Sequence, residues 1–234
     1  MIQTKHSLSG RFIADMVSGP QLDRAFRRIC FQCYDSQGCS ERCCHATGYG
    51  LFDGLILRTA AAVGHLPLLL VANHFSWWDG FIQHRLNKLF FHRRPYVMML
   101  EEQLRKHPVL TRCGAFSVRH NSRDIIRSLN YAVRVLDDPR NMLVIFPQGR
   151  IESVNIQHVA FQSGVDYIMR HVAADFAVVM NANIVDYGPH SRPSLKVCFD
   201  CRNSRDFSDF QHLEHDFNIF YNRMKSQNQC CWMR

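Results

Sequence analysis

Residues 66–80 read LPLLLVANHFSWWDG, an apolar run followed by polar and aromatic residues. Its first seven residues form a short apolar run, which favours a strand that is covered on both faces. We therefore predict a strand over Leu66–Ala72, followed by a turn and a helix over Trp78–Phe90. In open α/β sheets, ligands bind outside the carboxyl ends of the strands. The polar pair Asn73 and His74, which follows this strand, is therefore a candidate for a functional site.

Short apolar runs and helical patterns continue to alternate along the chain. Further strands are predicted over Pro95–Leu100, Ala115–Arg119, Asn141–Phe146, Phe176–Asn181 and Leu195–Phe199. Further helices are predicted over Arg123–Asp137, Val165–Val172 and Asp209–Met224. Ser122 can cap the first of these helices, and Pro139 follows its end. Strands that alternate with helices indicate an α/β fold with a mixed, largely parallel sheet flanked by helices.

The first 50 residues differ in character from the rest. Residues 1–20 are polar without a clear period, a short basic helix is predicted over Gln21–Arg28, and a Cys- and Gly-rich stretch follows. We predict a small N-terminal helical and Cys-rich appendage over residues 1–50 and a second domain over residues 51–234. The apolar and basic side chains of the appendage would suit a membrane-facing surface. Packing of the same helix against the core is the alternative.

The composition of the 234 residues narrows the class of protein. Hydrophobic residues make up 47 % and charged residues 21 %, which is ordinary for a globular protein and excludes a wholly disordered chain. The formal net charge of +8 favours anionic partners, such as phospholipid surfaces or phosphorylated cofactors. The sequence has no recognisable nucleic-acid motif, so no nucleic-acid partner is predicted. Charged residues interrupt the N-terminus and every long apolar run, so neither a signal peptide nor a membrane span is predicted.

Ten cysteines are a high count for a chain of this length. Without an export signal we expect a reducing compartment, where cysteines are thiols or metal ligands more often than disulfides. Short spacers are typical of structural zinc, and the candidate zinc ligands are Cys30, Cys33, Cys39 and Cys43. The alternative is a set of small, reduced, apolar side chains. Because the second half of the set lacks a standard spacing, we predict no metal site.

His74 and Asp79 are the candidate catalytic pair. Neutral imidazole can take a proton from a hydroxyl near neutral pH. A carboxylate on the other ring nitrogen fixes the tautomer and stabilises the imidazolium that forms, as in serine-protease triads. No serine nucleophile is needed here, because the acceptor substrate would supply the hydroxyl. On spacing alone, an Asp that caps a helix beside a surface His is the alternative.

Three further segments place polar residues where predicted strands or loops end. Arg119 ends one strand, and its planar guanidinium suits a phosphate group; a solvated charge is the alternative. Phe146–Arg150 follows another strand, and its Pro and Gly would shape a turn from which its Gln and Arg can offer donors to a head group. The loop at 161–165 runs into a helix, and its amides could meet an anion.

Taken in order, these segments resemble the lysophospholipid (glycerolipid) acyltransferase family, in particular the 1-acylglycerol-3-phosphate acyltransferases. That family is marked by Asn-His-x4-Asp, Gly-x-x-Phe-x-Arg and Phe-Pro-Glu-Gly-Thr blocks, and then by a Phe-Lys-x-Gly-like turn. The matching blocks here run from Asn73 to Gly164, and a looser resemblance extends to about residue 200. The ordered set is far more specific than any single block.

The resemblance implies a role for each matched residue. His74 would be the general base, and Asp79 its partner. The residues implied in substrate binding are Asn73, Gly114, Phe116, Arg119, Phe146, Pro147, Gln148, Gly149 and Arg150. The resemblance also implies an acyl-CoA or acyl-carrier-protein donor, a lysophospholipid or other lipid acceptor, and no cofactor. It further implies a peripheral or monotopic place on the cytoplasmic face of a membrane.

Two departures from the family pattern bear on the acceptor. Gln148 stands where the family has Glu, and Arg150 stands where it has Thr. Both changes alter the charge of the head-group pocket. By analogy they favour an acceptor other than lysophosphatidate, such as a carotenoid glycoside or a lyso-ornithine lipid. A catalytically inactive lipid-binding module of the same fold is the alternative, and the intact His74 and Asp79 disfavour it.

Overall fold

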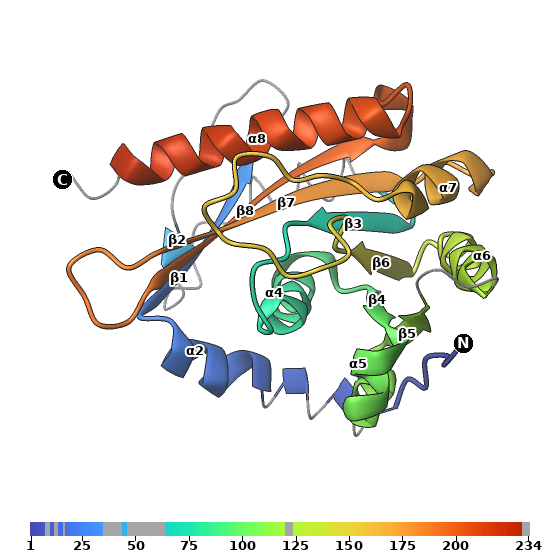
Figure 1. Cartoon of the computed structure of the whole chain (residues 1–234), viewed down its shortest axis with the longest axis horizontal. Helices are drawn as coiled ribbons and strands as arrows, with labels where there is room; N and C mark the ends of the chain where they lie inside the picture. The colour runs from blue at the N-terminus through green and yellow to red at the C-terminus, as the bar shows by residue number, and fades with distance from the viewer. Residues whose placement is uncertain are drawn as a thin grey trace.

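The computed structural model describes residues 1–7, 10–11, 14–15, 17–34, 44–45, 64–119 and 124–230. Within these residues, an eight-stranded sheet has helices on both faces (Figure 1). The spatial order of its strands is β2-β1-β8-β7-β3-β6-β4-β5. The strands are β1 (Arg28–Tyr34), β2 (Cys44–His45), β3 (Leu68–Ala72), β4 (Arg94–Leu100), β5 (Ala115–Val118), β6 (Asn141–Ile145), β7 (Ala177–Asp186) and β8 (Ser194–Asn203).

Helices connect most of these strands. The α-helices are α2 (Leu22–Ala25), α4 (Asp79–Leu86), α5 (Glu101–Lys106), α6 (Ile125–Val135), α7 (Ser163–His171) and α8 (Phe210–Cys230). Two π-helical turns, η1 (Val17–Gln21) and η2 (Asn87–Phe91), adjoin α2 and α4. The 3₁₀ segments are η3 (Pro108–Cys113) and η4 (Ser204–Asp206). Among the described residues, no helix is long and apolar enough to cross a membrane.

The strand pairing confirms the predicted fold class. β3 pairs in parallel with β6 and with β7, and β4 pairs in parallel with β6 and with β5. The antiparallel pairs are β7 with β8 and β1 with β2, whereas β1 and β8 run parallel. The sheet is therefore mixed and largely parallel. The carboxyl ends of β3, β4, β5, β6 and β7 share an edge, which is where ligands bind in open α/β sheets.

Different helices cover the two faces of the sheet. Successive side chains of a strand point to opposite faces, so alternate residues of one strand pack against different helices. In β3, Leu69 and Val71 pack with the helices α6, α7 and α8. Leu68 and Leu70 pack on the other face with α2 and α4. In Figure 1, α8 lies across the first face and α4 lies against the second.

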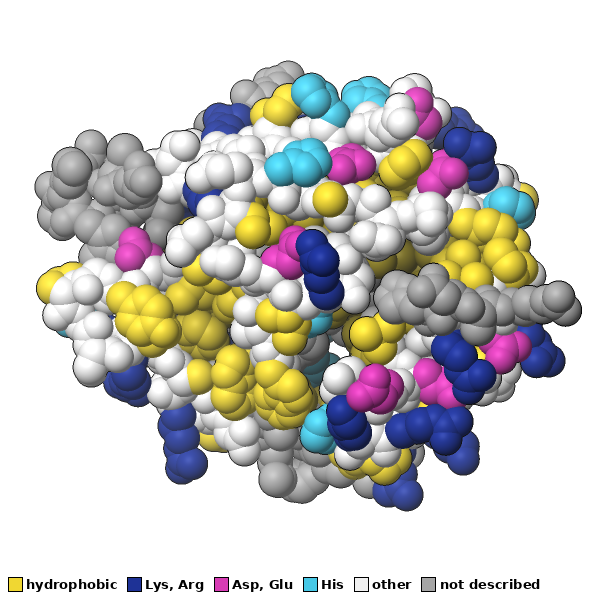
Figure 2. All heavy atoms as spheres, in the orientation of Figure 1, with side chains coloured by type: hydrophobic (Ala, Val, Ile, Leu, Met, Phe, Trp, Pro, Cys, Tyr) yellow, Lys and Arg dark blue, Asp and Glu magenta, His cyan; other side chains and the backbone are white. Residues whose placement is uncertain are grey.

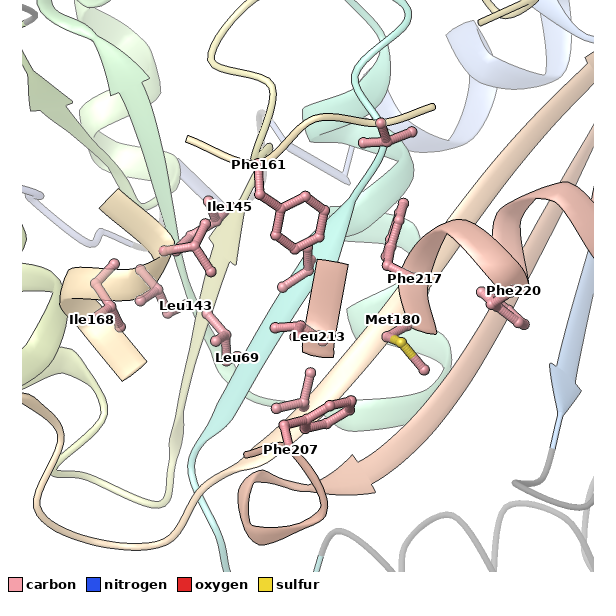
Figure 3. Close-up of a cluster of buried hydrophobic side chains, with 14 of the residues drawn as sticks. Leu69, Leu143, Ile145, Phe161, Ile168, Met180, Phe207, Leu213, Phe217 and Phe220 are labelled. Atoms are coloured by element: carbon pink, nitrogen blue, oxygen red, sulfur yellow. The ribbon is translucent and has the colours of Figure 1, made fainter. Parts of the chain in front are cut away.

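The first face holds the larger core (Figure 3). There, Leu69, Leu143 and Met180 of three adjacent strands face Ile168 of α7 and Phe217 of α8. All five side chains are fully buried. Burial of one such side chain stabilises a fold by about 1.5–3 kcal/mol, so this layer fixes the central strands and the residues at their ends.

Strand β1 is the main difference from the sequence prediction. The sequence predicts that residues 28–34 belong to an appendage outside the sheet, whereas they pair in parallel with all of 194–200. Every residue of β1 after Arg28 is buried. The predicted basic helix over Gln21–Arg28 is accordingly short and ends at Ala25. The proposed boundary at residue 50 lies outside the described residues and stays a prediction.

The first residues lie against the sheet, although their sequence is polar and has no clear period. The N–H of Ile2 donates to Ser117 Oγ over 2.6 Å, and the N–H of Ser117 donates to the carbonyl of Ile2 over 2.9 Å. Thr4 Oγ1 lies 3.0 Å from the carbonyl oxygen of Gly114. Residues 2–4 therefore cover β5, which would otherwise present an open edge of the sheet.

Candidate active site

His74 lies just beyond the carboxyl end of β3, and Asp79 is the first residue of α4. The turn between them folds back, so that His74 Nδ1 lies 2.6 Å from Asp79 Oδ2. The imidazole is 23 % exposed, whereas the carboxylate is fully buried. The structure thus brings the predicted pair together, with the ring between the buried carboxylate and solvent.

Asp79 accepts hydrogen bonds from the whole turn. Oδ2 accepts from the main-chain N–H of Phe75 and of Ser76, at 2.7 and 2.9 Å. Oδ1 accepts from Ser76 Oγ at 3.0 Å. An ionised carboxylate accepts only, so the ring of His74 donates from Nδ1 and a neutral ring carries its lone pair on Nε2. Among the residues that the structure describes, Nε2 has no hydrogen-bond partner, which leaves it ready to act as a base.

Two neighbouring side chains limit the movement of His74. Phe146, which follows β6, stacks on the imidazole with ring centroids 4.5 Å apart and planes 21° apart. Asn73 donates from Nδ2 to the carbonyl of Asn183 over 3.0 Å, and its Oδ1 accepts from the N–H of Asn183 over 2.7 Å. The Asn73 side chain thereby extends the pairing of β3 with β7. It is buried, and its two hydrogen bonds hold the end of the strand; the substrate-binding role that the resemblance implies for it stays a prediction.

The turn after β6 contacts the main chain of His74. Gln148 is buried, and its Oε1 accepts from the N–H of His74 over 2.6 Å. Its Nε2 donates to Glu152 Oε2 over 2.7 Å, and Arg150 Nε donates to Glu152 Oε1 over 2.8 Å. The hydrogen bond from Gln148, followed by that from Arg150, lowers the pKa of the Glu152 carboxyl. Gln148 therefore supports His74, with its oxygen on the main chain of His74 and its nitrogen on Glu152.

Arg119 lies at the carboxyl end of β5, on the same edge of the sheet as His74. Three strand spacings separate β5 from β3, or about 14 Å. Arg119 Nη2 lies 2.7 Å from Oε1 of Glu101, a residue with a buried side chain that also contacts Arg105. Arg119, which the sequence predicts to bind a phosphate group, is thus half-exposed and paired with a carboxylate.

A protein-family model described as Acyltransferase matches residues 57–187, more than half of the chain. The chain belongs to this acyltransferase family. The match includes β3 through β7, and with them His74, Asp79, Arg119 and the turn after β6. No curated protein matches the chain. The family assignment therefore covers the segment in which these residues lie.

Gly114 and Phe116 of the acyltransferase lie away from this edge. Gly114 precedes β5 and so lies at the opposite edge of the sheet; its φ is 109°, and a Cβ there would lie 2.0 Å from the carbonyl oxygen of Pro95. Phe116 is fully buried and packs edge-on against Tyr131 of α6, with ring centroids 5.0 Å apart. Both residues therefore help to build β5, and the substrate-binding role that the resemblance implies for them stays a prediction.

Pro147 and Gly149 shape the turn that carries Gln148. Pro147 is buried, and its carbonyl accepts from the N–H of Gln162 over 2.9 Å. Gly149 has φ 68°, a left-handed conformation that favours glycine, and its N–H donates to the carbonyl of Phe146 over 3.1 Å. In this turn the side chain of Gln148 is buried beside His74, whereas that of Arg150 is exposed to solvent.

The candidate zinc set is only partly within the described residues of the acyltransferase. Cys30 and Cys33 are buried in β1, whereas Cys39 and Cys43 lie outside the described residues. Residues three apart in a strand point to opposite faces, so Cys30 and Cys33 cannot share one metal ion while β1 stays paired. Among the described residues, no cluster of three or more His, Cys, Asp or Glu could hold a metal ion.

Glu152 is the functional candidate that the sequence prediction missed. Its N–H donates to the carbonyl of His74 over 2.9 Å, and its carboxylate contacts both Gln148 and Arg150. One signal was available: a carboxylate stands four residues after a Gln that occupies the position of the family's Glu. Only the fold of the loop shows that this carboxylate returns to the site.

The ion pair behind Arg119 predicts a pH-dependent contribution to stability. Arg119, and then Arg105, lowers the pKa of the Glu101 carboxyl from 4.5 to about 2. A lowered folded-state pKa stabilises the fold above the ordinary value, and this contribution is lost as the pH falls toward about 2. Glu101→Gln should therefore lower the free energy of unfolding near neutral pH, with a deficit that shrinks below about pH 5.

Urea unfolding of wild type and Glu101→Gln from about pH 7 to about pH 3 measures this deficit. Glu102→Gln is the matched control, because Glu102 is exposed on the same helix and contacts only Lys106 among the described residues. Its surface ion pair is expected to contribute little. A deficit for Glu101→Gln that stays constant down to about pH 3 would contradict the assignment.

Proposed function

We propose that the protein transfers a fatty acyl group from a thioester donor, acyl-CoA or acyl-carrier protein, to a hydroxyl of a lysophospholipid or other lipid acceptor. His74 is the general base of this reaction, and Asp79 is its partner. The observation that carries the proposal is the 2.6 Å contact between His74 Nδ1 and Asp79 Oδ2. This contact supports a neutral ring that donates from Nδ1 to Asp79 and keeps its basic lone pair on Nε2.

The reaction follows from these positions. Nε2 takes the proton of the acceptor hydroxyl as its oxygen attacks the thioester carbonyl, which gives a tetrahedral intermediate. The C–S bond then breaks, and the imidazolium returns the proton to the leaving thiolate. Asp79 stabilises the positive ring between these two steps. The products are an ester and a free thiol, and no group on the protein is acylated.

The charges at this edge of the sheet support an acceptor or donor with a phosphate group. Arg119 and Arg150 both leave a large part of their side chains exposed there. Guanidinium groups bind phosphate through paired donors. Because Glu152 supplies a carboxylate next to Gln148, the loss of the family's Glu does not leave the site without negative charge. A phosphate-bearing acceptor is therefore as compatible with the site as a carotenoid glycoside or a lyso-ornithine lipid.

Aromatic side chains beside the site support a place at a membrane surface. Trp77 is 53 % exposed, and its ring lies 5.3 Å from that of Trp78 and 5.1 Å from that of Phe81. Figure 2 shows hydrophobic side chains gathered between α4 and the β7–β8 hairpin. Tryptophan favours the membrane–water interface, and the net charge of +8 favours the anionic cytoplasmic leaflet. We therefore propose peripheral or monotopic association with that face.

Thiol release tests the proposal. Purified protein is mixed with an acyl-CoA or an acyl-carrier protein and with one acceptor from a panel of lysophospholipids, lyso-ornithine lipid and carotenoid glycoside in vesicles. We expect one donor–acceptor pair to release thiol and to form an equal amount of acylated lipid, measured by mass spectrometry. Vesicle binding without thiol release for every pair would instead indicate an inactive lipid-binding module.

A further inference from the structure

The turn after β6 holds the main chain of His74 on both sides. The N–H of His74 donates to Gln148 Oε1, and the carbonyl of His74 accepts from the N–H of Glu152. Sheet pairing cannot supply these bonds, because the pairing of β3 with its neighbours ends at Ala72. The two bonds therefore set the position from which the imidazole reaches Asp79.

The amide of Gln148 has one possible orientation. It is 4 % exposed, and its two polar atoms meet a main-chain N–H at one end and the carboxylate of Glu152 at the other. An N–H requires an acceptor, and an ionised carboxylate requires a donor. The reversed orientation would place two donors together and two acceptors together. A neutral amide at position 148 is thus matched to a carboxylate at position 152.

Arg150 completes the arrangement. Its Nε and Nη2 both lie 2.8 Å from Glu152 Oε1, so the second carboxylate oxygen is also occupied. Glu152 therefore has each oxygen bound to a different partner: Oε2 to Gln148 and Oε1 to Arg150. The lowered pKa of Glu152 agrees with a carboxylate that stays ionised in this position.

We propose that Gln148 and Glu152 form a coupled positioning pair for His74, in which one position carries an amide and the other a carboxylate. The effect of this pair on catalysis rests on the proposed function, but neither side chain needs to touch the reacting atoms. A carboxylate at position 148 could also accept from the N–H of His74. It would then lie at hydrogen-bond distance from the carboxylate of Glu152, and two carboxylates that close cannot both ionise without a large cost.

The reversed pair keeps every hydrogen bond. With Gln148→Glu and Glu152→Gln combined, the carboxylate at position 148 accepts both from the N–H of His74 and from the amide at position 152. The amide oxygen at position 152 accepts from Arg150. The total charge of the turn is unchanged, so the double variant should position His74 as the wild type does, whereas Gln148→Glu alone should not.

The test compares wild type, Gln148→Glu and the double variant Gln148→Glu/Glu152→Gln at about pH 8.5 and about pH 6. At the higher pH, we expect Gln148→Glu to lower kcat by about tenfold to 100-fold with KM unchanged, because the base is misplaced. Its Tm should also fall. Both differences from wild type should narrow at the lower pH, where the two carboxylates share a proton. The double variant should recover most of kcat and Tm at both pH values.

Gln211→Glu is the matched control. This substitution makes the same change of charge, and Gln211 is exposed in the first turn of α8. Its kcat and Tm should differ from wild type by the same small amount at both pH values.

A Gln148→Glu variant that matches wild type at the higher pH would overturn the proposal, as would a double variant that stays as impaired as the single one. If only the double variant folds, the coupling is supported. If the wild type transfers no acyl group, the proposed function fails and the Tm values alone test the pair. A Tm of Gln148→Glu that lies below that of wild type at the higher pH, and that the double variant restores, would still support the coupling of positions 148 and 152.

Discussion

Replacing His74 by Ala is expected to lower kcat for acyl transfer by about 10²–10⁴-fold or more. The variant removes the only group in the described part of the site that is placed to take the hydroxyl proton beside Asp79. The loss should appear in kcat and not in KM, because the imidazole takes up the proton in the transition state and does not contribute to binding of the lipid. The measurement is the initial rate of thiol release with saturating donor and acceptor.

A matched histidine controls for this loss. His171 lies at the end of α7, is exposed, and stacks on Tyr167. His171→Ala should leave kcat within about twofold of wild type, since surface substitutions away from a site have small effects. Full activity in the His74→Ala variant would remove the imidazole from the mechanism and leave only the family assignment.

The site was predictable from sequence where its residues follow strands directly. His74, Phe146 and Arg119 each come just after an apolar run, and parallel strands bring such positions to one edge. Asp79 was predictable from the same logic, because it starts the next helix. The contact of each side chain was not predictable: Arg119 meets Glu101, and that pairing depends on how β4 and α5 are placed against β5.

Gly114 and Phe116 show that residues of one motif can lie in different parts of the fold. They share a block with Arg119, and the resemblance therefore implies one binding role for all three. The structure separates them, because a strand of four residues carries Gly114 to one edge of the sheet and Arg119 to the other. A block of sequence can thus hold a strand end, a core residue and a surface cation for different physical reasons.

β1 could not be assigned from its own residues. Its cysteines, with their metal-like spacing, suggest a loop or a metal site rather than a strand. Its partner β8 lies more than 150 residues further along the chain, as the pairing of Arg28 with Ser194 shows. Such a distant pairing leaves no local signal in the sequence. β1 is a strand because it pairs with β8 and because its side chains are buried on both faces of the sheet. The same holds for Glu152, whose role depends on a loop that returns to β3.

Asp79→Asn is expected to lower both kcat and stability. The amide oxygen can still accept from the N–H groups of Phe75 and Ser76, but the amide carries no charge to stabilise the imidazolium of His74. Loss of the equivalent carboxylate in a His–Asp pair lowers kcat by about 10⁴-fold. Hydrogen bonds to a charged group are worth about 1.5–3 kcal/mol, against about 1 kcal/mol for neutral ones, and Asp79 accepts four. We therefore expect the free energy of unfolding to fall by about 2–4 kcal/mol.

Asp166→Asn provides the comparison for both measurements. Asp166 pairs with Arg170 on the surface of α7, and an exposed ion pair of this kind contributes about 0–1 kcal/mol. Urea unfolding and thiol release, measured on the same preparations, separate the two roles of Asp79. A variant that loses stability but keeps kcat would show that the carboxylate only builds the turn between β3 and α4. Loss of kcat beyond the loss of folded protein would show that Asp79 also acts on the ring of His74, by fixing its tautomer and position and by stabilising the imidazolium.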